Sequence, residues 1–227
     1  MADPIHLDTK SGYDRWSTIY DDELNPLVML EESVVRKWIA SPAGLRIVDV
    51  GCGTGRHAVW LAEAGASVDA YDASPGMLSK ARDKPSADRV QFHTHSLPAP
   101  LPAADGTYDV ALLALVADHL EDPEGTLRDV RRVLKPDGLL VFTVMHPAIN
   151  LLGITARFTD PDSGDEVRVA AFEHTYGAYV MAALRAGFAI EKIVEQKADA
   201  ALAARTPRAE KYVGWPLLLA LRLRVET

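Results

Sequence analysis

The chain has a single cysteine, Cys52, among its 227 residues. An intrachain disulfide therefore cannot form, and a metal site built on several cysteines is excluded. This cysteine usage is typical of a reducing compartment, so we expect the cytoplasm. The first residues carry no basic segment followed by an apolar run, which argues against a signal peptide.

Long apolar runs and excess positive charge are also lacking. No stretch approaches the ~20 apolar residues needed to cross a membrane, and the most apolar run, 216–221, has the length of a buried strand. The 24 Lys and Arg residues are outnumbered by 32 Asp and Glu, giving a formal net charge of −8. This charge argues against a protein that binds nucleic acid through its phosphates. We expect a small-molecule partner, and neither a membrane nor a nucleic acid.

Strand-like and helix-like patterns alternate between residues 45 and 145, which predicts an open parallel sheet with helices on both faces. Ser74-Pro75 and Asp122-Pro123 are typical helix starts. After His146-Pro147 the alternation breaks. A turn-rich stretch then predicts a hairpin-like insertion over the strand ends, followed by a helix near 175–186 and two strands.

Three glycines, Gly51, Gly53 and Gly55, separate the first of these strands from a helix that opens at Arg56. A strand, a sharp turn and a helix N-terminus bring main-chain N–H groups close to a ligand. The spacing is G-x-G-x-G, whereas a dinucleotide fingerprint has its third glycine at the place of Arg56. With the acidic Asp49 entering the turn, the loop favours a nucleoside with an amino-acid tail over a diphosphate.

A second acidic residue, Asp72, follows the next predicted strand, 17 residues beyond Gly55. An ionised carboxylate only accepts hydrogen bonds and can take both hydroxyl hydrogens of a ribose. The alternative role is a cap for the helix that begins near Ser74-Pro75.

Together these segments resemble the motifs of class I S-adenosylmethionine-dependent methyltransferases. The motif-bearing segments are 48–55, 68–78, 108–123 and 132–138. The resemblance implies an α/β fold, a Rossmann-like doubly wound sheet of seven strands, mostly parallel with an antiparallel C-terminal edge strand. It implies S-adenosylmethionine as the cofactor and S-adenosylhomocysteine as the product. The expected organisation is one methyltransferase domain, with an N-terminal helical cap or lid (1–44), a cofactor-binding core (45–145), a substrate-side insertion (146–174) and a C-terminal helix with strands (175–227).

The resemblance also assigns cofactor contacts. Many relatives have an acidic residue near Ser96, where this chain has His95-Ser96-Leu97-Pro98, so only Ser96 and Leu97 are carried over. The expected cofactor-binding residues are Tyr13, Tyr20, Asp49, Gly51, Cys52, Gly53, Gly55, Asp72, Ala73, Met77, Ser96, Leu97 and Leu113. No metal site is expected, because no carboxylate or cysteine nearby completes a set with His93 and His95.

The predicted reaction is methyl transfer to an O, N or C atom of a small-molecule acceptor by in-line displacement. Alignment and desolvation can supply most of the acceleration. A hydroxyl acceptor would gain from a general base, for which histidine is well suited. His146 is the first candidate and His119 the second, with His174 or Tyr176 entering from the insertion.

Two alternatives stay open at this point. One is a protein that keeps the cofactor without methylating, as a repurposed cyclase or a regulatory binder. The other, disfavoured by the glycine spacing, is an NAD-dependent oxidoreductase. The N-terminal aromatic residues suit a homodimer interface as well as a lid.

Overall fold

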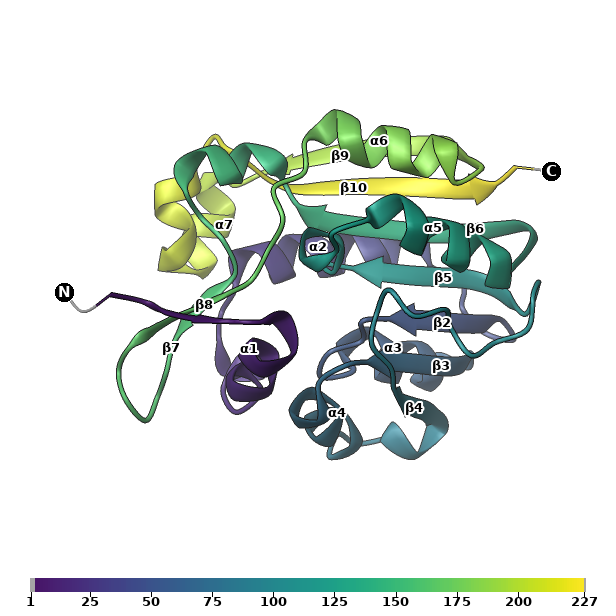
Figure 1. Cartoon of the computed structure of the whole chain (residues 1–227), viewed down its shortest axis with the longest axis horizontal. Coiled ribbons are helices and arrows are strands. Elements are labelled where there is room, and N and C mark those ends of the chain that lie inside the picture. Colours follow the sequence, from purple (N-terminus) through teal and green to yellow (C-terminus); the bar gives the residue numbers. More distant parts are fainter. Residues whose placement is uncertain (1–2, 227) are drawn as a thin grey trace.

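A seven-stranded sheet runs through the molecule in the order β4-β3-β2-β5-β6-β10-β9 (Figure 1). The computed structural model describes residues 3–226. Its parallel strands are β2 (Arg46–Val50), β3 (Ser67–Asp72), β4 (Val90–Thr94), β5 (Tyr108–Ala114) and β6 (Leu134–Met145). Strand β10 (Pro216–Val225) runs antiparallel between β6 and the edge strand β9 (Phe188–Lys197). The predicted Rossmann-like, mostly parallel sheet is confirmed, and its antiparallel strand lies one place in from the edge.

Helices cover both faces of this sheet. On one face lie α2 (Pro26–Trp38), α3 (Arg56–Glu63) and α4 (Pro75–Arg82), and on the other lie α5 (Pro123–Val133) and α6 (Tyr176–Arg185). Three of them begin with a capping residue followed by proline. Asn25 caps α2, Ser74 caps α4 and Asp122 caps α5, and each side chain accepts a hydrogen bond from an N–H of the first turn. Central strands covered on both sides need apolar residues throughout, which explains the continuous run in β5.

A second, three-stranded sheet lies beside the carboxyl ends of the parallel strands (Figure 1). The predicted insertion forms the antiparallel hairpin of β7 (Arg157–Thr159) and β8 (Glu166–Val169). The N-terminal strand β1 (Ile5–Leu7) pairs with β8 in parallel, and no pattern in the sequence predicts this pairing. The helix α1 (Thr9–Trp16) packs against β8 and α4.

Shorter elements complete the described part of the chain. The helix α7 is Ala200–Arg205, and short 3₁₀ helices occupy Tyr20–Asp22, Ala87–Arg89, Ala117–His119, Pro147–Leu152 and Pro207–Tyr212. The turn at Pro147–Leu152, α7, the turn at Pro207–Tyr212 and the start of β10 share a small apolar cluster. No helix within residues 3–226 has the length and apolar character that crossing a membrane requires.

Candidate active site

A cavity of about 260 Å³ opens at the carboxyl ends of β2, β3 and β5. Open α/β sheets bind their ligands at this edge. The cavity brings together eleven of the residues predicted to bind the cofactor. They are Tyr13, Tyr20, Asp49, Gly51, Cys52, Gly53, Asp72, Ala73, Met77, Ser96 and Leu97. We refer to it below as the first cavity.

The glycine loop is shaped by close packing. Gly51 has a φ of +76°, and a Cβ at this position would lie 2.3 Å from Cγ2 of Val116. The N–H groups of Gly51 and Cys52 both donate to the carbonyl of Tyr71, at 2.8 and 2.9 Å, and hold the loop against β3. Gly55 is the N-cap of α3 and faces Ala81 and Phe92, so it supports the loop without lining the cavity.

Asp72 is held by main-chain donors. Its Oδ2 accepts from the N–H of Gly53 at 2.7 Å and its Oδ1 from the N–H of Ser74 at 2.8 Å. Each carboxylate oxygen keeps a second lone pair, so the group can still accept from two hydroxyls. The capping role considered for Asp72 belongs to Ser74, whose Oγ accepts from the N–H of Met77 at 3.0 Å.

Two buried polar atoms on the lining residues have no hydrogen-bond partner in the described structure: Oδ2 of Asp49 and Nη1 of Arg56. Burial raises the pKa of Asp49 to about 7. The other terminal nitrogen of Arg56, Nη2, donates to Glu31 Oε2 at 2.6 Å, and the same buried glutamate lies 3.0 Å from His57 Nε2. One unpaired acceptor and one unpaired donor match the ammonium and carboxylate groups of an α-amino acid.

Arg56 is therefore a candidate that the sequence analysis missed. In the sequence, Arg56 stands where the third glycine of a dinucleotide fingerprint would be. A basic residue at the first position of the helix that follows the loop was the available signal. Its significance depends on Glu31, which is distant in sequence and fixes one end of the guanidinium.

A tyrosine and a histidine meet at the mouth of the first cavity. Nδ1 of His119 lies 2.7 Å from the carbonyl oxygen of Ala170, which can only accept, so Nδ1 carries the hydrogen. Nε2 of His119 then accepts from the hydroxyl of Tyr13 at 2.9 Å. Burial raises the pKa of Tyr13 well above its usual value, which keeps the phenol protonated. The pair joins α1 to the 3₁₀ helix Ala117–His119, which follows β5.

Further contacts anchor the N-terminal segment, which holds α1 and the 3₁₀ helix Tyr20–Asp22, to the chain that follows β2 and β3. Asp14 accepts from the hydroxyl of Ser74 at 2.5 Å and from the N–H of Gly76 at 2.9 Å. Asp21 accepts from the hydroxyl of Thr54 at 2.6 Å and pairs with Lys84 at 2.7 Å. These contacts hold the segment over the first cavity.

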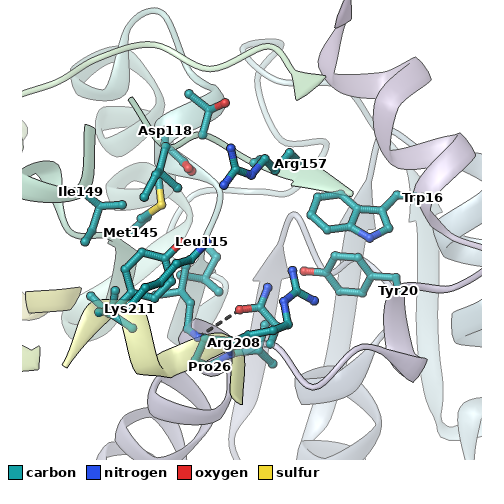
Figure 2. Close-up of a pocket in the computed structure, with 18 of the residues that line it drawn as sticks. Trp16, Tyr20, Pro26, Leu115, Asp118, Met145, Ile149, Arg157, Arg208 and Lys211 are labelled. Atoms are coloured by element: carbon teal, nitrogen blue, oxygen red, sulfur yellow. Dashed lines mark hydrogen bonds between the residues drawn. The ribbon is translucent and has the colours of Figure 1, made fainter. Parts of the chain in front are cut away.

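Figure 2 shows a second cavity, of about 180 Å³. It adjoins the first. Tyr13, Tyr20 and Leu115 line both cavities and form their common wall. Leu115 has a φ of +58°, and its N–H donates to the carbonyl of Thr143 at 2.9 Å. A left-handed leucine is a strained conformation of the kind that occurs at functional sites.

His146 and His174 lie apart from both cavities. His146 Nε2 lies 2.7 Å from Glu195 Oε1, and its Nδ1 accepts from the N–H of Ala148 at 3.1 Å, so it caps the Pro147–Leu152 turn. His174 Nε2 donates to the carbonyl of Leu120 at 2.7 Å. Of the three predicted histidines, His119 is the one that lines either of these two cavities, and it is therefore the base that we consider further.

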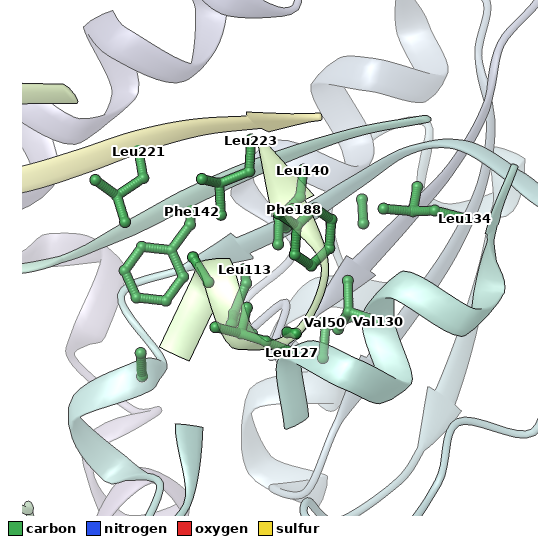
Figure 3. Packing of buried hydrophobic residues seen from close by; sticks show 14 of the residues in the cluster. Val50, Leu113, Leu127, Val130, Leu134, Leu140, Phe142, Phe188, Leu221 and Leu223 are labelled. Carbon is green, nitrogen blue, oxygen red and sulfur yellow. The ribbon is translucent and has the colours of Figure 1, made fainter. Parts of the chain in front are cut away.

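Leu113, also predicted to contact the cofactor, lies away from the first cavity. It is fully buried in the apolar cluster beneath α5 and α6, among Leu127 and Phe142 (Figure 3). Side chains alternate across a strand, so Leu112 and Leu113 point to opposite faces and neither reaches the end of β5. Ala114 and Leu115 line the first cavity there.

Comparisons with known proteins agree with this geometry. The family model described as "Methyltransferase domain" matches residues 48–142. A demethylmenaquinone methyltransferase of Tropheryma whipplei is 34% identical over 163 residues, which cover 65% of this chain and 67% of the relative. The chain belongs to the S-adenosylmethionine-dependent methyltransferases.

Two broader matches extend over most of this methyltransferase. An uncharacterized methyltransferase of Emericella nidulans is 27% identical over 252 residues, covering 92% of this chain and 87% of the relative. A crystal structure of an S-adenosylmethionine-dependent methyltransferase from Mesorhizobium loti matches with a TM-score of 0.69 at 27% identity, covering 86% of this chain and 97% of that one. The predicted enzyme class and cofactor are confirmed, and the oxidoreductase alternative is wrong.

Proposed function

We propose that this methyltransferase methylates an O, N or C atom of a small molecule bound in the second cavity. The observation that carries the proposal is the common wall of Tyr13, Tyr20 and Leu115, which brings an acceptor in one cavity next to a cofactor in the other. The second cavity is smaller than the first, which favours a small molecule as the methyl acceptor. The net charge of −8 does not favour nucleic acid as the acceptor.

The residues of the first cavity fit the cofactor. We propose that Asp72 accepts from the ribose hydroxyls and that Asp49 and Arg56 hold the ammonium and carboxylate of the amino-acid part. Met77 and Leu97 offer apolar surface to the base. When bound, S-adenosylmethionine supplies a methyl group already activated on a sulfonium, so the protein contributes alignment and exclusion of water.

The Tyr13–His119 pair provides a route for a proton. The hydroxyl oxygen of Tyr13 can accept a proton from an acceptor hydroxyl while its own proton passes to Nε2 of His119, 2.9 Å away. The carbonyl of Ala170 accepts from Nδ1 and stabilises the imidazolium that forms. Tyr13 stays neutral in this relay, in keeping with its raised pKa.

The test compares Tyr13→Phe and His119→Gln with the wild type. General-base catalysis contributes about 10²- to 10⁴-fold, so both variants should lose about 100-fold or more in kcat with hydroxyl acceptors. Production of S-adenosylhomocysteine measures turnover, and calorimetry with the same product measures cofactor-site affinity, which His119→Gln should lower far less than it lowers turnover. His174→Gln, a histidine outside both cavities, is the matched control and should retain turnover.

Two outcomes would count against the proposal. Wild-type turnover in Tyr13→Phe and His119→Gln would remove the relay. Cofactor binding without methylation of any acceptor, across a panel of phenols, amines and carboxylic acids, would favour the non-methylating alternative.

A further inference from the structure

Positive charge gathers at the second cavity, although the chain as a whole is acidic. Arg157 from β7, and Arg208 and Lys211 from the 207–212 turn, line it together (Figure 2). Within the described residues, Asp118 is the one carboxylate on its lining. Segments far apart in the sequence therefore deliver three cations to one small space in a protein of net charge −8.

The ion pairs that these cations already make are partly exposed, and one of them is long. Arg208 Nη1 lies 3.1 Å from Glu23 Oε2, and Arg157 Nη1 lies 3.9 Å from Glu166 Oε2. Lys211 lies over the ring of Tyr212, 5.0 Å from its centre, and has no ion pair within 4 Å among residues 3–226. Partly exposed ion pairs contribute little to stability, so these side chains can turn to an incoming anion at small cost.

The interior of the cavity carries two further unpaired polar atoms, the donor Nε1 of Trp16 and the acceptor Oδ1 of Asp118, both buried. Buried polar atoms normally have partners, so a ligand that supplies them gains free energy. Oδ1 of Asp118 lies 3.9 Å from Nε2 of His119, which places this acceptor beside the proposed proton route. Much of the remaining wall is apolar, with Leu115, Met145 and Ile149.

We propose that the methyl acceptor is a small organic acid with an apolar body. Its ionised carboxylate or phosphate is held by Arg208 and Lys211, which come from the same short 3₁₀ helix. The hydroxyl or amino group at its other end, which receives the methyl group, lies beside Tyr13 and Asp118. This inference rests on the proposed function, because it takes the second cavity to be the acceptor site.

Calorimetry on the enzyme saturated with S-adenosylhomocysteine tests the charge preference. The probes share one body and differ in charge: 4-hydroxyphenylacetate, its neutral amide, and the cation 4-hydroxyphenethylamine. One charge-assisted hydrogen bond corresponds to roughly tenfold in affinity, so the acid should bind about 10-fold or more tighter than the amide and the amine should bind worst. Inorganic phosphate and acetate are then compared as competitors of 4-hydroxyphenylacetate. Stronger competition by phosphate indicates a phosphate site, and stronger competition by acetate indicates a carboxylate site.

Single variants locate the anion site. Arg208→Gln and Lys211→Gln should each weaken binding of the acid by about 5- to 10-fold and leave the amide unchanged. Lys192→Gln removes the same charge from an exposed position on β9 that lines neither cavity, and it should have no effect. Thermal unfolding of each variant shows whether the fold is intact.

The results that would overturn the inference differ from those that would overturn the proposed function. Equal affinity for acid and amide, an equal loss in Lys192→Gln, or no binding of any acid by the product-bound enzyme would each refute the organic-acid acceptor. Methylation of neutral acceptors would then leave the proposed function standing. No methylation of acids or neutral molecules by enzyme that binds the cofactor would remove the proposed function itself.

Discussion

Replacing Asp49 by Asn should stabilise the cofactor-free enzyme at alkaline pH. Asp49 is 2% exposed, and its Oδ2 has no partner among the described residues. Burial raises its pKa from 3.8 to about 7, with Glu31 and Asp72 adding to the effect and Arg56 opposing it. The shift of about 3 units, at about 1.4 kcal/mol per unit, means that the ionised carboxylate costs the fold about 4 kcal/mol.

The sign of the pH dependence follows from the raised pKa. The native state holds the proton more tightly than the unfolded chain, so this stabilisation is complete below pH 3.8 and is lost as the pH rises through about 7. An asparagine does not titrate. The advantage of D49N in free energy of unfolding should therefore grow by about 3 kcal/mol between pH 5 and pH 8.

Urea unfolding of both proteins across this pH range is the assay. Asp109→Asn is the control, because Lys135, at 2.6 Å, and the N–H of Arg46 lower the pKa of Asp109. That stabilisation is lost only as the pH falls through the lowered pKa. The free energy of unfolding of D109N should therefore be lower than that of the wild type by the same amount from pH 5 to pH 8. A D49N difference that is equally flat would refute the burial argument. D49N should also bind S-adenosylhomocysteine more weakly, since the ammonium group loses its carboxylate partner.

Two other substitutions test the geometry of the first cavity. Asp72→Asn should weaken binding of S-adenosylhomocysteine by about 10-fold, because an amide oxygen accepts fewer hydrogen bonds than a carboxylate; an unchanged dissociation constant by calorimetry would contradict the ribose role. Gly51→Ala should lower the free energy of unfolding by about 2–3 kcal/mol, since its Cβ would lie 2.3 Å from Val116 at a φ of +76°. Gly106→Ala, at a φ of +63° with open space around it, should lose only about 1 kcal/mol, and equal losses would argue against the steric cause.

The sequence by itself determined the alternation of strands and helices and the place of the cofactor loop. Both are local properties of the chain. A proline after Ser74 or Asp122 starts a helix whatever lies around it, and three glycines between an apolar strand and a helix form a tight turn. Asp72 follows an apolar strand pattern and precedes a helix cap, and these local patterns predict its place at the end of β3, beside that loop.

Tertiary structure alone decided which side chains meet at the two cavities. Tyr13 and His119 bond across 106 positions, and His146 follows β6 as His119 follows β5 yet turns to Glu195. Leu113 is buried, whereas the next residue of β5, Ala114, lines the first cavity. Both belong to one continuous apolar run, so the sequence does not show at which residue the strand reaches the cavity. The cations of the second cavity come together through the packing of β7 and the 207–212 turn. Contacts between distant segments depend on the whole fold, so no local pattern could have predicted them.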